Sequence, residues 1–156
     1  MREPAPARPP GVEAPRCLGS VSGAFPGPTV VITGGLHGNE PAGVHAARAV
    51  LDELGAMHHV LRGHVVAFSG NRAALAENVR FTSRDLNRSW HETHLEGLQN
   101  APIGALQAED LEQRELVDAF VELERQSRSL VFVDLHTTSG PTEPFASFAD
   151  TGKNRR

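Results

Sequence analysis

The chain has 156 residues, of which 39% are hydrophobic and 22% are charged, and its formal net charge is -4. This size and composition are typical of one globular domain with a moderate core, and the negative charge argues against a surface for nucleic acid or an anionic membrane. The single cysteine, Cys17, excludes an internal disulfide framework and favours a cytoplasmic location, and no stretch is apolar enough to span a bilayer.

Residues 1–16 are rich in proline and contain no apolar run, so we expect no secretory signal there. Proline-rich chain favours extended conformations and buries little apolar surface. The sequence therefore predicts a disordered arm over residues 1–16. Residues 17–156 form the second unit, without an internal repeat or a dividing linker.

Short β-branched and apolar runs predict buried strands at three places, residues 29–33, 64–71 and 129–140. Asn39 offers an N-cap to a first helix, whose apolar residues follow at helical spacing up to Gly55. Alternating strands and helices predict an α/β fold with a mostly parallel sheet flanked by helices.

Two further helices are expected between the second and third predicted strands. Residues 72–78 allow about two helical turns directly after the second strand, and residues 105–126 carry an apolar helical face. Residues 78–103 are polar and show no convincing period. We therefore expect irregular structure between the two helices.

Polar side chains follow all three predicted strands, at the edge of the sheet where α/β proteins bind ligands. They are His37 and Glu40, Asn71 and Arg72, and Asp134 and His136. His-x-x-Glu alone is common, because a Glu in a first helical turn also complements the helix dipole. A second imidazole from a distant strand end makes a shared metal ion the stronger hypothesis.

His37, Glu40 and His136 would give a dication two imidazoles and one carboxylate and leave a fourth position open, as in catalytic zinc sites. Asp134 lies two residues before His136, where it either orients that imidazole or makes a strand-end hydrogen bond. The neighbouring glycines would suit a phosphate, but the sequence has neither a Walker lysine nor a dinucleotide fingerprint.

Asn87 and Arg88 lie side by side in RDLNR, residues 84–88. A guanidinium binds a carboxylate through two parallel hydrogen bonds, and an amide adds a donor. The alternative is a solvated loop arginine. Arg72 is a second basic candidate, with a surface position at a helix start as its alternative. The remaining histidines, including HETH at residues 91–94, show no comparable pattern and are expected on the surface.

Three motifs resemble those of the succinylglutamate desuccinylase and aspartoacylase family, which is related to the zinc carboxypeptidases. They are GGLHGNEPAG, then GNRAAL followed by RF and RDLNR, and DLHTTSG. The resemblance runs from about residue 18 onward and implies a zinc-carboxypeptidase-like α/β domain. It also implies hydrolysis of the amide, or an ester, of an N-acyl amino acid or similar small carboxylate.

Carried over by position, the resemblance implies His37, Glu40 and His136 as ligands of Zn2+. It implies Asn87 and Arg88, together with Asn71, as the residues that bind the substrate. The family's carbonyl-polarising arginine is expected two residues after the Asn of the second motif, where this chain has alanine. Arg72, one residue earlier, is the candidate for that role.

The family's general base, a glutamate, is expected well downstream of the third ligand, and Glu143 lies too close to His136 to match it. We therefore expect an apparently truncated domain, the N-terminal part of a longer catalytic domain, with the base absent from this chain. A non-catalytic zinc-binding module and a metallocarboxypeptidase-like peptidase are the alternatives. The expected partner is a small carboxylate substrate, and a homo-oligomer is left open.

Overall fold

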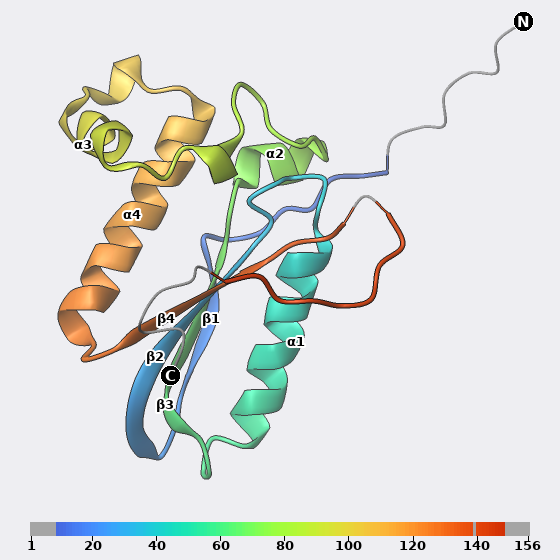
Figure 1. The fold of residues 1–156 in the computed structure, drawn as a ribbon, viewed down its shortest axis with the longest axis vertical. Helices are drawn as coiled ribbons and strands as arrows, with labels where there is room; N and C mark the ends of the chain where they lie inside the picture. The colour runs from blue at the N-terminus through green and yellow to red at the C-terminus, as the bar shows by residue number, and fades with distance from the viewer. Residues whose placement is uncertain (1–8, 139, 149–156) are drawn as a thin grey trace, which may run out of the picture.

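The computed structural model describes residues 9–138 and 140–148 (Figure 1). The strands are β1 (Cys17–Ser22), β2 (Phe25–Gly34), β3 (Arg62–Ser69) and β4 (Leu130–Leu135). The helices are α1 (Ala42–Ala56), α2 (Arg72–Glu77), α3 (Glu92–Asn100) and α4 (Ala108–Gln126), with short 3-10 turns η1 (Leu86–Arg88) and η2 (Ile103–Ala105). None of the described helices combines the length and hydropathy that crossing a bilayer requires.

The four strands form one sheet in the order β1-β3-β2-β4. β2 pairs in parallel with both β3 and β4, while β1 pairs antiparallel with β3. This confirms the predicted mostly parallel sheet. Because β2, β3 and β4 run in the same direction, the loops that follow them leave from one edge, and the loops after β2 and β4 carry His37, Glu40 and His136.

Helices cover both faces of the sheet, with α1 on one side and α4 on the other (Figure 1). Successive strand residues point to opposite faces, so neighbours in β2 and β3 enter different clusters. The cluster toward α4 contains Val31, Val66, Phe68 and Leu116. The cluster toward α1 contains Ile32, Val65, Ala67, Ala47 and Leu51. Both central strands are thus buried on two faces, which explains their continuous apolar runs.

The first helix begins later than predicted. Pro41 occupies the N-cap position with φ -67° and ψ -15°, and no side chain caps the helix. The prediction of Asn39 as N-cap was wrong, because Pro41 already has helical dihedrals and its carbonyl accepts from the N–H of Val44 and of His45. The helix then continues past Gly55 to Ala56.

Two elements were not predicted. β1 is a short, largely polar strand that pairs with β3 through an irregular register near Gly19. α3 lies within the segment expected to be irregular, and Leu98 is its buried residue. Neither element carries the apolar period that a pattern search detects, because each covers little of the core.

Residues 9–16 pass beside α2 and form neither helix nor strand. The N–H of Val12 donates to the carbonyl of Leu75 at 2.9 Å, and the hydroxyl of Ser69 donates to the carbonyl of Pro15 at 2.6 Å. Arg16 donates to the carbonyls of Ser69 and Gly70. Residues 9–16 are thus hydrogen-bonded to α2 and to the end of β3, and disorder over residues 1–16 as a whole stays a prediction. Residues 1–8 lie outside the described residues.

Candidate metal centre

The loop between β2 and α1 turns two polar side chains inward. Gly35 adopts φ +77°, a conformation that favours glycine, and Gly38 lies so close to α2 that a Cβ would meet a backbone carbon of Ala74 at 2.0 Å. This close packing leaves His37 and Glu40 only 4% and 8% exposed. The glycines therefore serve backbone packing, and Gly38 in particular faces α2 and not an open phosphate cradle.

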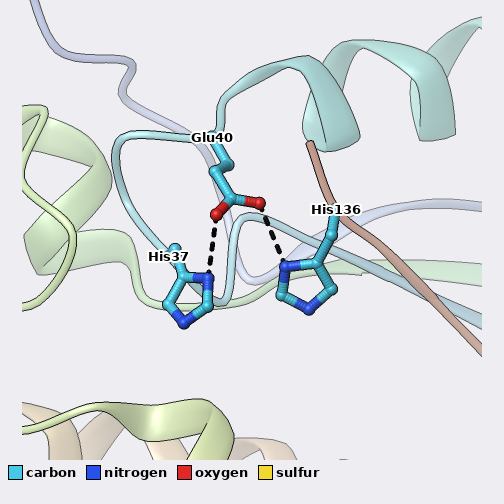
Figure 2. A group of neighbouring side chains, drawn as sticks. All are labelled: His37, Glu40 and His136. Atoms are coloured by element: carbon cyan, nitrogen blue, oxygen red, sulfur yellow. Dashed lines mark hydrogen bonds and ion pairs between the residues drawn. The ribbon is translucent and has the colours of Figure 1, made fainter. Parts of the chain in front are cut away.

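His37, Glu40 and His136 converge at the carboxyl edge of the sheet (Figure 2). The Nδ1 atoms of the two imidazoles lie 2.9 Å from Glu40 Oε1 and 3.0 Å from Glu40 Oε2, respectively. The ring centroids are 5.0 Å apart, and one donor atom from each of the three residues lies within 4.8 Å of the others. The structure thus brings the three predicted ligands, from loops 96 residues apart, to one point.

A second carboxylate contacts the outer nitrogen of each imidazole. Asp85 Oδ1 lies 3.0 Å from His37 Nε2, and Asp134 Oδ2 lies 2.5 Å from His136 Nε2. The hydroxyl of Thr33 donates to the other oxygen of Asp134 at 2.7 Å. Asp134 thus makes both contacts considered from the sequence, one to the His136 imidazole and one across the strands to Thr33, while the RDLNR pattern had not indicated a contact between Asp85 and His37.

The arrangement of donors fits a divalent cation. A neutral imidazole has one N–H, yet both nitrogens of His37 and of His136 face carboxylate oxygens. A cation between the inner nitrogens and Glu40 would replace the inner protons and leave each Nε2–H to donate to its aspartate. Histidine ligands usually carry such an outer carboxylate, and two imidazoles with one carboxylate match the preferences of zinc.

Two carboxylates at this edge, Glu40 and Asp85, have pKa values below their ordinary range. Burial acts to raise the pKa of Glu40, but hydrogen bonds from the Thr137 N–H and from His136, with the two imidazoles nearby, bring it below its ordinary value. Burial acts in the same direction on Asp85, and the contacts with His37 and Arg80 outweigh it, so its pKa is also lowered. Charged carboxylates are what a cation at this point requires.

Arg80 is a functional candidate that the sequence pattern did not identify. Its Nη1 lies 3.6 Å from Glu40 Oε1 and its Nη2 lies 3.3 Å from Asp85 Oδ2, while 47% of the side chain is exposed. The carbonyl of Arg80 accepts from the N–H of Gly38 at 3.1 Å, which fixes its backbone against the ligand loop. The guanidinium thus lies beside the cluster and faces solvent. Its signal was the RF pair before RDLNR.

Arg72 and Asn71 are not brought to the cluster. Arg72 donates to Glu112 at 3.1 Å and to Glu115 at 2.7 Å, and both acceptors belong to α4. Asn71 caps α2 by accepting from the N–H of Ala74, and its amide donates to Glu109 at 3.1 Å. This placement does not support carbonyl polarisation by Arg72 or substrate binding by Asn71, because contacts with helices hold both side chains elsewhere.

Asn87 and Arg88 form part of turn η1 next to the cluster. Asn87 Nδ2 lies 3.4 Å from His136 Nε2, and the backbone N–H of Asn87 donates to Asp85 Oδ1 at 3.1 Å. The Nε of Arg88 lies 3.5 Å from Asp85 Oδ2, and 82% of the side chain is exposed. Both residues are therefore linked to the ligand set through Asp85 and present donors to solvent beside it.

Comparisons with known proteins identify a family for this chain. The sequence model described as the succinylglutamate desuccinylase/aspartoacylase catalytic domain matches residues 26–148. A succinylglutamate desuccinylase of Shewanella piezotolerans is 32% identical over 110 residues, which cover 69% of this chain and 31% of that protein. The chain therefore spans about a third of the length of the curated relatives it matches.

Two solved structures show the same fold. Murine aminoacylase 3 is 32% identical with a TM-score of 0.51, over 71% of this chain and 35% of that one. The succinylglutamate desuccinylase of Chromobacterium violaceum has a TM-score of 0.56 over 73% of this chain and 35% of that one, at 24% identity, which supports the fold alone. The resemblance and the carboxypeptidase-like fold inferred from the motifs are thus confirmed.

Proposed function

Because the chain belongs to the succinylglutamate desuccinylase/aspartoacylase family, we propose that it is the metal-binding part of a zinc-dependent hydrolase. The substrate of this proposal is an N-acyl amino acid, and the bond cleaved is its amide. The observation that carries the proposal is the convergence of His37, Glu40 and His136 within 4.8 Å, each imidazole with a second carboxylate behind it. A cytoplasmic location, inferred from the single cysteine, stays a prediction.

In this proposal His37, Glu40 and His136 hold the ion and leave one position open. Bound zinc supplies Lewis acidity and lowers the pKa of water from 15.7 to about 7. With the ion bound, each imidazole would donate its outer Nε2–H to Asp85 or Asp134, which favours the tautomer whose unprotonated Nδ1 faces the ion.

Arg80 takes the role first considered for Arg72. Its guanidinium lies 3.6 Å from Glu40 and faces solvent, so it can donate to a substrate carbonyl placed over the ligand set. Negative charge develops on that oxygen during attack, and a donor fixed beforehand stabilises the transition state. The ion pair with Asp85 fixes the guanidinium in place before substrate binds.

Asn87 and Arg88 are proposed to bind the substrate carboxylate. Arg88 is 82% exposed next to the cluster, and its planar fork can accept a carboxylate in two parallel hydrogen bonds. Anchoring this end of the substrate would orient the amide toward the ligands. The same residues would also suit the terminal carboxylate of a peptide, so a carboxypeptidase-like activity is the second candidate.

The proton of the attacking water requires a base beyond the ligand set. Near the cluster, the described carboxylates Glu40, Asp85 and Asp134 each already contact an imidazole. We propose that the base belongs to the remainder of a full-length catalytic domain, since the relatives are about three times as long as the matched segment. The 156-residue chain is then expected to bind substrate and to hydrolyse it slowly or not at all.

Calorimetric titration of the zinc-loaded chain tests the substrate class. N-succinyl and N-acetyl amino acids are compared with peptides that have free C-termini, in wild type and in Arg88→Ala. Loss of a charge-assisted contact is worth roughly 1.5–3 kcal/mol, so Arg88→Ala should weaken acyl amino acid binding at least about tenfold.

Arg72→Ala is the matched control, because its guanidinium is held by α4 and should leave binding unchanged. Tighter binding of peptides than of acyl amino acids would favour the peptidase alternative. Zinc binding without affinity for either ligand class would favour a non-catalytic module. Equal losses in Arg72→Ala and Arg88→Ala would contradict the proposed carboxylate site.

A further inference from the structure

Glu109, in the first turn of α4, is a buried carboxylate with an unusually complete set of partners. The residue is 0% exposed. Oε1 accepts from Asn71 Nδ2 at 3.1 Å and from both the N–H and the hydroxyl of Thr82 at 2.6 Å. Oε2 accepts from the N–H of Ser83 at 3.1 Å and from its hydroxyl at 2.5 Å. All of these partners are donors.

These bonds hold the segment that leads into the metal centre. Thr82 and Ser83 lie between Arg80 and Asp85, in chain that forms neither helix nor strand. Arg84 is tied to the same turn of α4, since it donates to Asp110 at 2.5 Å. From Ser83 the chain reaches Asp85 in two residues, and α4 holds this short path through Glu109 at its start and through Asp110 and Gln113 at Arg84.

We propose that Glu109 is a positioning residue of the metal centre, which fixes the Thr82–Ser83 backbone so that Asp85 meets His37. The inference rests on the proposed metal site. A carboxylate is needed because a glutamine would turn an NH2 group toward one of the donating N–H groups. Released from Glu109, the segment keeps the contacts of Arg84 with α4 but loses the bonds that fix the Thr82–Ser83 backbone, so Asp85 holds the His37 imidazole less firmly.

Cobalt titration of the 156-residue chain, followed by the visible absorption of the bound ion, tests the proposal. Replacing a group behind a metal ligand typically costs 10–100-fold in affinity. Glu109→Gln should therefore weaken cobalt binding by about tenfold and change the visible spectrum. Glu115→Gln is the matched control on the same helix, because Glu115 pairs with Arg16 and Arg72 and not with this segment.

A double variant separates positioning from general stabilisation. If Glu109 acts through Asp85, then Asp85→Asn combined with Glu109→Gln should bind cobalt as weakly as Asp85→Asn alone. Additive losses would overturn the proposal, as would wild-type affinity in Glu109→Gln. Amide hydrogen exchange of Asn87, whose N–H donates to Asp85, gives a readout without metal and should become faster in Glu109→Gln.

Should Glu109→Gln fail to fold, Thr82→Val with Ser83→Ala removes one hydroxyl donor from each carboxylate oxygen and leaves the backbone bonds in place. Weaker cobalt binding by this variant supports the proposal, and unchanged binding overturns it. A wild-type chain that binds no cobalt overturns the proposed function and this inference together. Normal wild-type binding with an unaffected Glu109→Gln overturns the inference alone.

Discussion

Protonation of Glu109 should destabilise the protein in a defined range of pH. Burial acts to raise the pKa of this carboxyl, but the hydrogen bonds from Ser83, Thr82 and Asn71 lower it from 4.5 to about 2. A folded-state pKa below the unfolded value contributes stability that is fully present above about pH 4.5 and is lost as pH falls through about 2. At neutral pH the contribution is about 3 kcal/mol, since one pKa unit corresponds to roughly 1.4 kcal/mol.

Urea unfolding of wild type and Glu109→Gln at about pH 7 and about pH 3 measures this contribution. Near pH 3 only about 1 kcal/mol of it should be left, so the stability difference between the two proteins should shrink by about 2 kcal/mol. Carboxylates that Glu109 does not position titrate alike in both proteins and cancel in the difference, whereas Asp85, whose pKa is lowered through its contact with His37, changes the difference in the same direction as Glu109. A stability difference that is the same at both pH values would refute the reasoning.

Three further substitutions test the packing, the ligand support and the sheet edge. Gly38→Ala should lower the free energy of unfolding by roughly 3 kcal/mol or more in chemical denaturation, because the added Cβ would meet the backbone of α2 at 2.0 Å. As the control, Gly55→Ala adds a Cβ that meets nothing within 4 Å and should stabilise α1. Equal stability of the two variants would contradict this packing. Asp85→Asn should lower zinc affinity about 10–100-fold in competition with a chelator, and unchanged affinity would exclude its support of His37. Val133 is 39% exposed on β4, which pairs only with β2 among the described residues, so we expect self-association of the chain through this strand edge. Val133→Lys should then reduce the association measured by sedimentation velocity, and a wild-type chain that stays monomeric, or an association unaltered by the substitution, would contradict this expectation.

The fold was predictable where burial imposes a period on the sequence. β2 and β3 are covered on both faces, so their apolar runs were visible, and α4 has an apolar stripe facing the sheet. β1 and α3 bury little and left no such signal. The start of α1 was misplaced because capping depends on backbone dihedrals at Pro41, which residue preferences at Asn39 do not determine.

The three candidate ligands were predictable because they follow strand ends, whereas the positions of Arg72 and Arg80 were not predictable from the sequence around them. His37, Glu40 and His136 follow parallel strands whose carboxyl ends share one edge, so topology alone brings them together. Arg72 also follows a strand, yet Glu112 and Glu115 of α4 hold it, an interaction between distant segments that no local pattern contains. Arg80 reaches the cluster from irregular chain, where no period marks its direction.

Metal binding by the purified chain tests the proposed centre most directly. Elemental analysis together with X-ray absorption at the zinc edge should find a single zinc ion per chain, coordinated by two imidazoles and a carboxylate oxygen at about 2.0–2.2 Å. His136→Ala, which removes the ligand that follows β4, should lose the ion. Full retention of zinc in that variant, or a wild-type spectrum without imidazole, would contradict the proposed site.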